Sequence, residues 1–204
     1  MSTVTASPVR ELVSSRGRIP GEVGIWVFLL IDFLFFGAIF GVFMVERASD
    51  PVTFAHSSRE LAVGWGALNT LVLLTSSMSM AYALRFIRSG ALRAARRMLL
   101  VTGLMGAWFV VDKAFEWTSV LRAGHVPVEN QFFYLYFTVT GVHLMHVLIG
   151  LVVLGYLYLA TGRELGRRAA PSRLLRRNSE SGAAYWHFVD LLWLVLFAIL
   201  YLVV

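Results

Sequence analysis

Residues 24–45 read GIWVFLLIDFLFFGAIFGVFMV, and Asp32 is the only ionisable side chain among them. A helix needs about 20 apolar residues to cross the hydrocarbon core of a bilayer, so this stretch predicts a membrane-spanning helix. Basic residues precede it, as they precede the core of a signal peptide, but it is too long for one and lacks a small-residue cleavage site. We therefore expect this helix to stay in the mature protein.

Four further stretches have the length and composition of membrane spans: residues 64–86, 97–119, 131–160 and 184–204. The chain of 204 residues is 58% hydrophobic and 15% charged, with a mean hydropathy of +0.71. Soluble domains are nearer 45–50% apolar and about 25% charged. We predict an all-α integral membrane protein, a bundle of five transmembrane helices in which a tail (1–20) precedes a single membrane domain (21–204).

The arginines predict how the bundle is oriented. Fourteen of the 18 basic residues fall in the tail and in the second and fourth connecting segments: Arg10, Arg16, Arg18, Arg85, Arg88, Arg93, Arg96, Arg97, Arg163, Arg167, Arg168, Arg173, Arg176 and Arg177. The other side carries Arg47, Arg59 and Arg122. By the positive-inside rule the N-terminus is cytoplasmic and the C-terminus outside. The net charge of +6 therefore indicates topology, not a nucleic-acid partner.

Eight aspartate, glutamate, lysine and histidine side chains lie inside the predicted spans: Asp32, Asp112, Lys113, Glu116, His143, His146, His187 and Asp190. Such a group costs at least ~2.5 kcal/mol at membrane depth, so it usually faces a partner, a cavity or a pathway. The chain has no cysteine, which excludes disulfides, thiolate metal sites and iron–sulfur clusters.

Depth divides these eight residues. At a rise of about 1.5 Å per residue, Asp32 lies about 12 Å from the inner end of its helix. His146, His187 and Asp190 fall in the same inner half, so we predict that the four share one buried polar layer, with His143 nearer the bilayer centre. His187 and Asp190 are three residues apart on one helical face, which predicts a hydrogen-bonded pair.

Trp186 and Trp193 flank the predicted His187–Asp190 pair near the inner end of the last span. Tryptophan is enriched at both membrane–water interfaces, where its ring reaches the headgroup level. We therefore expect both tryptophans to act as interfacial anchors.

Asp112, Lys113 and Glu116 form a charge cluster in the outer half of the third span. Glu116 is four residues from Asp112 and three from Lys113, so all three can share a helix face. A Lys113–Glu116 pair neutralises one charge, and Asp112 then needs either another partner or a raised pKa. Structural neutralisation and a role in transport both stay open.

His143 and His146 lie at i, i+3, which suits a metal or haem, a proton relay or simple hydrogen bonding. A metal site wants three or four protein ligands, and a bis-histidine haem needs histidines on opposed helices, where only His187 is available. We predict no metal site.

Asp32 lies between apolar residues, a setting that favours the protonated acid. It is either a structural group or a proton carrier.

Small and hydroxyl residues predict how the helices pack. Gly37 and Gly41 form a small-xxx-small pair in the first span, and Gly103 and Gly106 lie close together in the third. Such residues let helix backbones approach one another in a membrane. The second span is rich in polar side chains, for which we expect helix–helix hydrogen bonds: Asn69, Thr70, Thr75, Ser76, Ser77 and Ser79.

Four blocks of sequence resemble subunit III of the haem-copper oxidases, the cytochrome c oxidase subunit 3 family. They are YWHFVDLLW (185–193), TGVHLMHVLIG (140–150), LNTLVLLTSS (68–77) and KAFEW (113–117). The resemblance covers residues 21–204 and all five spans in order. The chain departs from the seven-helix form, because the first two helices of that form have no counterpart and Asp32 stands where longer members carry a glutamate.

The resemblance implies an accessory subunit of the aerobic respiratory chain in the bacterial plasma membrane, with no catalytic residue and no redox centre of its own. Haem and copper would lie in catalytic subunit I, accompanied by subunit II, and Asp32 would support proton uptake. In seven-helix members, lipids occupy a cleft next to the first two helices. Here that cleft would be incomplete or shared with another subunit, so bound phospholipid stays an open expectation.

Other interpretations stay open at this point. Five-helix members accompany quinol oxidases, bacterial cytochrome c oxidases and nitric-oxide-reductase gene clusters, and residues 136–146 are most similar to the last of these branches. A membrane b-type cytochrome would use His143 or His146 with His187. A small proton-coupled transporter would use Asp32 as its carrier, although the chain shows no inverted repeat.

Overall fold

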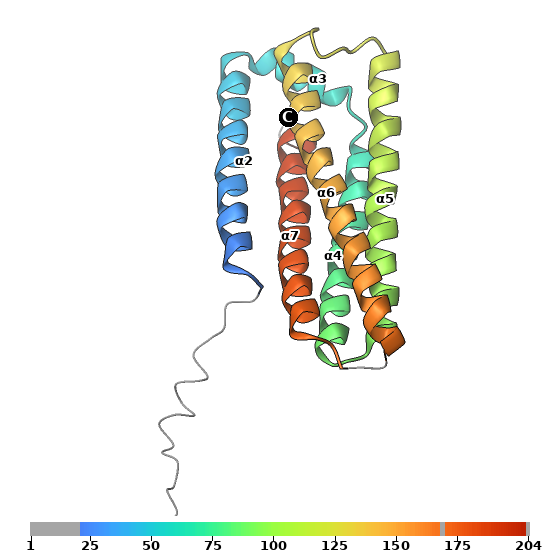
Figure 1. Cartoon of the computed structure of the whole chain (residues 1–204). Coiled ribbons are helices and arrows are strands. Elements are labelled where there is room, and N and C mark those ends of the chain that lie inside the picture. The colour runs from blue at the N-terminus through green and yellow to red at the C-terminus, as the bar shows by residue number, and fades with distance from the viewer. Residues whose placement is uncertain (1–20, 168–169, 203–204) are drawn as a thin grey trace, which may run out of the picture.

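A computed structural model describes residues 21–167 and 170–202 as an antiparallel bundle of long helices (Figure 1). The long helices are α2 (Val23–Ser49), α4 (Val63–Arg88), α5 (Leu92–Arg122), α6 (Gln131–Arg167) and α7 (Arg173–Phe197), followed by a π-helical turn, η1 (Ala198–Leu202). All five are long and apolar enough to cross a membrane, so the predicted spans are confirmed. The predicted tail, 1–20, lies outside the described residues.

Several helix ends differ from the predicted bounds, most of all the start of α7, and one further helix is present. α7 begins at Arg173, well before residue 184, because the Ser172 side chain caps the helix by accepting a hydrogen bond from Leu175 N at 3.1 Å. A short helix that we did not predict, α3 (Pro51–Arg59), follows α2. Asp50 caps it by accepting from Thr53 N at 3.1 Å, and Pro51 occupies its first position.

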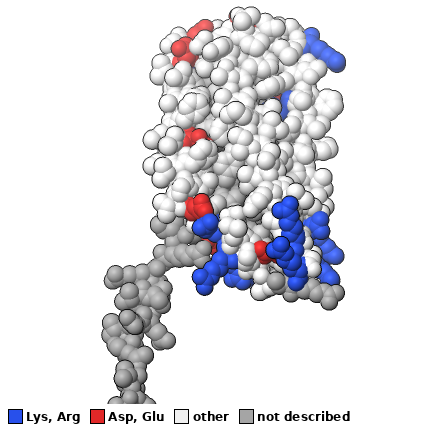
Figure 2. All heavy atoms as spheres, in the orientation of Figure 1, with Lys and Arg blue, Asp and Glu red and all other residues white. Residues whose placement is uncertain are grey.

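Arginines gather at one end of the bundle (Figure 2). This end, which we call the basic end, holds ten of the described arginines: Arg85, Arg88, Arg93, Arg96, Arg97, Arg163, Arg167, Arg173, Arg176 and Arg177. The opposite end holds Arg47, Arg59 and Arg122. The remaining predicted members, Arg10, Arg16, Arg18 and Arg168, lie outside the described residues.

α7 lies in the middle of the bundle, and Trp186 joins it to three other helices. Its ring fits between Gly106 on α5 and Gly150 on α6, where an added Cβ would come within 2.6 and 2.7 Å of ring carbons. Its Nε1 donates to Ser76 Oγ on α4 at 3.1 Å. Trp193 is buried as well and donates to Thr70 Oγ1 at 3.1 Å. The prediction of interfacial anchors is therefore wrong.

The polar residues of α4 confirm the predicted helix–helix hydrogen bonds. Besides Thr70 and Ser76, which accept from the two tryptophans, Ser79 Oγ lies 2.6 Å from Thr102 Oγ1 on α5. Thr75 is the exception, because its hydroxyl bonds the backbone of its own helix.

α2 stands at the edge of the bundle and packs against α6 and α7 through a narrow stripe of side chains (Figure 1). The stripe consists of Leu29, Asp32, Phe36 and Phe43. Gly37 and Gly41 lie off this stripe, and a Cβ at either would meet nothing within 4 Å. The predicted small-residue contact is therefore not made by these glycines within the described chain, whereas Gly106 does make one.

Candidate functional site

Asp32 on α2 meets His146 on α6 within the bundle. The distance from Asp32 Oδ2 to His146 Nε2 is 3.3 Å, and both residues are buried. The two residues therefore lie at one depth, as predicted. The residues next to Asp32 in the sequence offer it no partner, because His146 lies 114 positions further along the chain.

The other ring nitrogen of His146 decides what this pair can do. Its Nδ1 lies 2.8 Å from the carbonyl oxygen of Val142, which can only accept a hydrogen bond, so Nδ1 carries a proton. Nε2 then faces Asp32 either as a lone pair beside a protonated acid or as N–H beside a carboxylate. Asp32 Oδ2 accepts no hydrogen bond from the described residues, so the two groups are close but are not hydrogen-bonded in this arrangement.

Neighbouring side chains fix the position of His146. Phe36 packs edge-on to the His146 ring, with centroids 5.3 Å apart, and Tyr185 donates to the His146 carbonyl at 3.0 Å. The site therefore lies where α2, α6 and α7 meet. The Asp32 side chain keeps 13% of its surface exposed, so the Asp32–His146 pair lies at the rim of the bundle and not at its centre.

The charge cluster on α5 is a second buried site. Lys113 is wholly buried, and its Nζ lies 2.8 Å from Glu116 Oε2, which confirms the predicted pair. Lys113 also donates to Tyr201 OH at 3.1 Å and lies 4.5 Å from the centroid of the Trp193 ring. Tyr136 and Tyr201 both donate to Glu116 Oε1. These bonds neutralise the pair and hold both of its side chains in place.

Asp112 has no such partner. Its Oδ2 accepts a hydrogen bond from Asn69 Nδ2 on α4, and none of the described residues donates to its Oδ1. The partner that we expected for Asp112 is therefore a neutral amide.

The remaining polar residues do not join Asp32 and His146 in one hydrogen-bonded layer. His143 packs against Phe109 and Trp193, with ring centroids 5.6 and 5.5 Å away, and neither of its ring nitrogens bonds a described residue. His187 Nδ1 lies 2.6 Å from Ser77 Oγ on α4.

Asp190 is buried, and neither of its carboxylate oxygens is hydrogen-bonded within the described chain. The predicted His187–Asp190 pair is therefore wrong. His187 is hydrogen-bonded instead to the hydroxyl of Ser77, which lies 110 residues away in the sequence.

No group of three or more His, Cys, Asp or Glu residues that could hold a metal ion occurs in the described ranges 21–167 and 170–202. The acidic and basic residues inside the spans therefore lie in separate places: the Asp32–His146 pair, the Lys113–Glu116 cluster beside Asp112, His187 beside Ser77, and His143 and Asp190 without a hydrogen bond to a described residue. These features define a helical membrane protein with polar side chains buried between its helices.

Comparison with known proteins gives the family. The family described as "Cytochrome c oxidase subunit III" matches residues 18–204. The chain is 30% identical over 181 residues to cytochrome c oxidase subunit 3 of Thermostichus vulcanus, covering 88% of this chain and 86% of the relative. The chain belongs to the cytochrome c oxidase subunit III family.

Two further relatives differ in the oxidase that their names specify. A probable cytochrome c oxidase subunit 3 of Mycobacterium bovis is 28% identical, with 89% of this chain and 87% of the relative covered. A cytochrome bo(3) ubiquinol oxidase subunit 3 of Buchnera aphidicola is 24% identical, with 88% and 84% covered. The match extends over most of each relative, so the family likeness concerns the whole membrane domain.

Proposed function

We propose that this chain is the third, non-catalytic subunit of a haem-copper terminal oxidase in a bacterial plasma membrane. Family membership and the names of the relatives support this assignment. In such an assembly the haems and copper belong to catalytic subunit I, which works with subunit II, and this chain packs beside them. The relatives named above are oxidases, which favours oxygen over nitric oxide as the electron acceptor.

The arginine-rich end supports the proposed orientation. The positive-inside rule assigns the basic end to the cytoplasm, which puts the start of α2 on that side. Asp32 is nine residues from the start of α2, so it would lie about 13 Å along the helix from the side where protons are taken up.

The observation that carries the proposal is the Asp32–His146 pair, with its 3.3 Å separation and its position at the rim of the bundle. A carboxyl group and an imidazole nitrogen 3.3 Å apart can exchange a proton after a small side-chain movement. We propose that it supports proton uptake by the catalytic subunit and thereby protects that subunit from inactivation during turnover.

The test compares Asp32→Asn and His146→Gln with a control, Glu46→Gln, which lies on α2 but toward the opposite end. The complex would be purified from each strain, and proton uptake and loss of oxidase activity would be followed during turnover. We expect both site variants to assemble, to take up protons several-fold more slowly and to inactivate several-fold sooner, with the control unchanged. Unaltered uptake and lifetime across about pH 6–9 would refute the proton role.

A further inference from the structure

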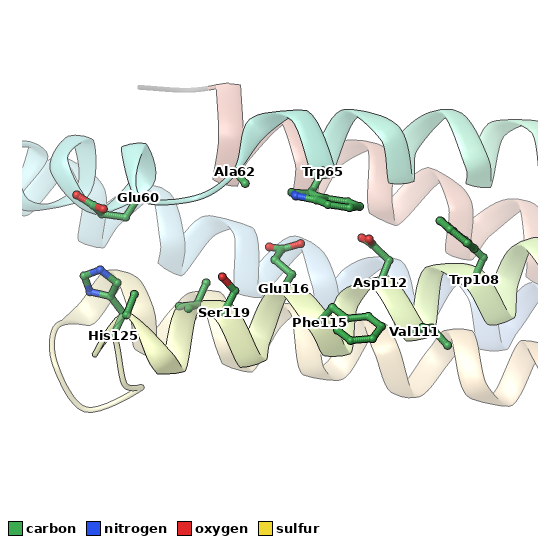
Figure 3. Close-up of a pocket in the computed structure, with 12 residues that line it drawn as sticks. Glu60, Ala62, Trp65, Trp108, Val111, Asp112, Phe115, Glu116, Ser119 and His125 are labelled. Carbon is green, nitrogen blue, oxygen red and sulfur yellow. The ribbon is translucent and has the colours of Figure 1, made fainter.

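A pocket of about 560 Å³ opens between α4 and α5 toward the end opposite the basic end (Figure 3). Asp112 and Glu116 point into it from α5, and Glu60 lies near its outer mouth. Trp65 lies across the pocket on α4, facing the two carboxylates, and Trp108 lies on α5 beyond Asp112 (Figure 3). The volume is in the range of pockets that hold small molecules, about 300–1,000 Å³.

The charges in this pocket do not balance. Lys113 neutralises Glu116 but points away from the pocket, toward Tyr201 and Trp193. Asp112 is only 6% exposed, and its one hydrogen bond comes from a neutral amide, so its Oδ1 lacks a donor among the described residues.

The other charged groups at the pocket do not supply the missing cation. His125 lines the mouth but is bonded to Glu129 at 3.0 Å, and Glu60 adds a further acid. With Asp112 ionised, the pocket therefore holds more negative charge than the described residues around it neutralise.

Aromatic rings supply a second feature that favours a cation. Trp65 is 52% exposed, Trp108 53% and Phe115 73%, so each presents a ring face that no described residue of the chain covers. The face of an aromatic ring attracts ammonium groups, and tryptophan does so most strongly. An acid beside uncovered aromatic rings suits an organic cation better than a metal ion, which prefers several oxygen ligands.

We propose that this pocket binds the ammonium group of an alkylamine, carried either by a phospholipid headgroup or by a free amine. The ammonium donates to Asp112 Oδ1 and lies against the Trp65 ring. The alkyl part packs on Val111, Phe115 and Trp108, which line the rest of the pocket. This site is separate from the Asp32–His146 pair and does not depend on the role proposed for that pair.

The experiment uses the purified complex in two arms. In the first, calorimetric titration compares butylammonium chloride with sodium chloride and with butanol, a neutral molecule of similar size. In the second, native mass spectrometry compares phosphatidylethanolamine with phosphatidylglycerol retained after reconstitution with both lipids. Asp112→Asn keeps the size of the side chain, Trp65→Leu removes the ring, and Glu22→Gln, at the basic end, is the control.

We expect butylammonium to bind where sodium and butanol do not, with affinity about tenfold weaker in Asp112→Asn and several-fold weaker in Trp65→Leu. Selective retention of phosphatidylethanolamine that both variants lose would identify a lipid headgroup as the source. Binding of butylammonium without such retention would identify a free amine. The proposal is overturned if the wild-type complex binds neither amine, or if both variants bind as the wild type does. If a basic side chain of another subunit fills the pocket, the wild-type complex will bind neither amine and the proposal is overturned.

Discussion

Replacing Gly106 by alanine tests how Trp186 holds the bundle together. A Cβ at residue 106 would lie 2.6 Å from Trp186 Cη2 and 3.0 Å from Leu151 Cδ2. The leucine methyl can rotate away, but the Trp186 ring is enclosed on its other side by Gly150. We expect Gly106→Ala to lower the free energy of unfolding by about 1–3 kcal/mol, the usual cost of overpacking a core.

The loss of stability caused by Gly106→Ala should depend on whether the Trp186 ring is present. Trp186→Leu removes the ring and the hydrogen bond to Ser76, which should cost about 2–4 kcal/mol. In that background the alanine at 106 no longer meets Cη2, so the double variant should be more stable than the sum of the single effects by about 1–2 kcal/mol.

Gly103→Ala is a matched control, because it lies one turn earlier on α5 and a Cβ there meets nothing within 4 Å. It should be neutral or stabilise by up to about 1 kcal/mol, since alanine favours helix. The assay is equilibrium unfolding of the purified chain in mixed micelles, followed by circular dichroism. Equal effects at 103 and 106, or strict additivity of Gly106→Ala and Trp186→Leu, would refute this account of the packing.

Three further predictions concern charged side chains. Lys113→Met should destabilise the chain by about 3–5 kcal/mol because it leaves Glu116 buried without its cation, and adding Glu116→Gln should recover part of that loss in the same unfolding assay. Hydrogen bonds from the side chain and backbone of Thr53 lower the pKa of Asp50, so its capping of α3 is complete above the ordinary aspartate pKa and is lost as the pH falls through the lowered value. The protection factors of the α3 amides, which correct for intrinsic exchange, should therefore fall in acid and depend less on pH in Asp50→Asn; equal pH dependence in the two proteins would contradict this. Asp190→Leu should leave the free energy of unfolding of the isolated chain unchanged or raise it, because neither carboxylate oxygen is hydrogen-bonded within the described chain. A loss above about 3 kcal/mol would contradict this.

Membrane insertion made the helices predictable from sequence. Each span must satisfy its backbone within one helix, so a run of apolar residues is enough to predict it. The Lys113–Glu116 pair was equally accessible, because a spacing of three residues brings two side chains together on any helix. The same reasoning gave Asp32 and His146 a common depth.

The contacts between helices were not accessible in this way. Tyr136 and Tyr201, which complete the site around Glu116, lie 20 and 85 residues from it, and no local spacing predicts them. His187 is hydrogen-bonded to Ser77, and not to Asp190 as predicted, because α4 packs against α7.

The error over Trp186 had a different cause. A tryptophan near a predicted helix end usually marks the membrane interface, but α7 extends eleven residues further than expected, so the ring falls in the core. Gly106 and Gly150, which make room for the ring, were the residues in the sequence that could have indicated its buried position.

The most direct test of the proposed role is to purify the chain by an affinity tag from membranes with and without the gene for the haem-copper catalytic subunit. The account predicts that the tagged chain brings down a haem-copper subunit with its Soret absorption, and that the chain purified alone shows no haem absorption. A Soret band in the isolated chain that His187→Ala abolishes would contradict the account and identify a b-type cytochrome. Failure to recover any haem protein with the tagged chain would contradict its place in an oxidase.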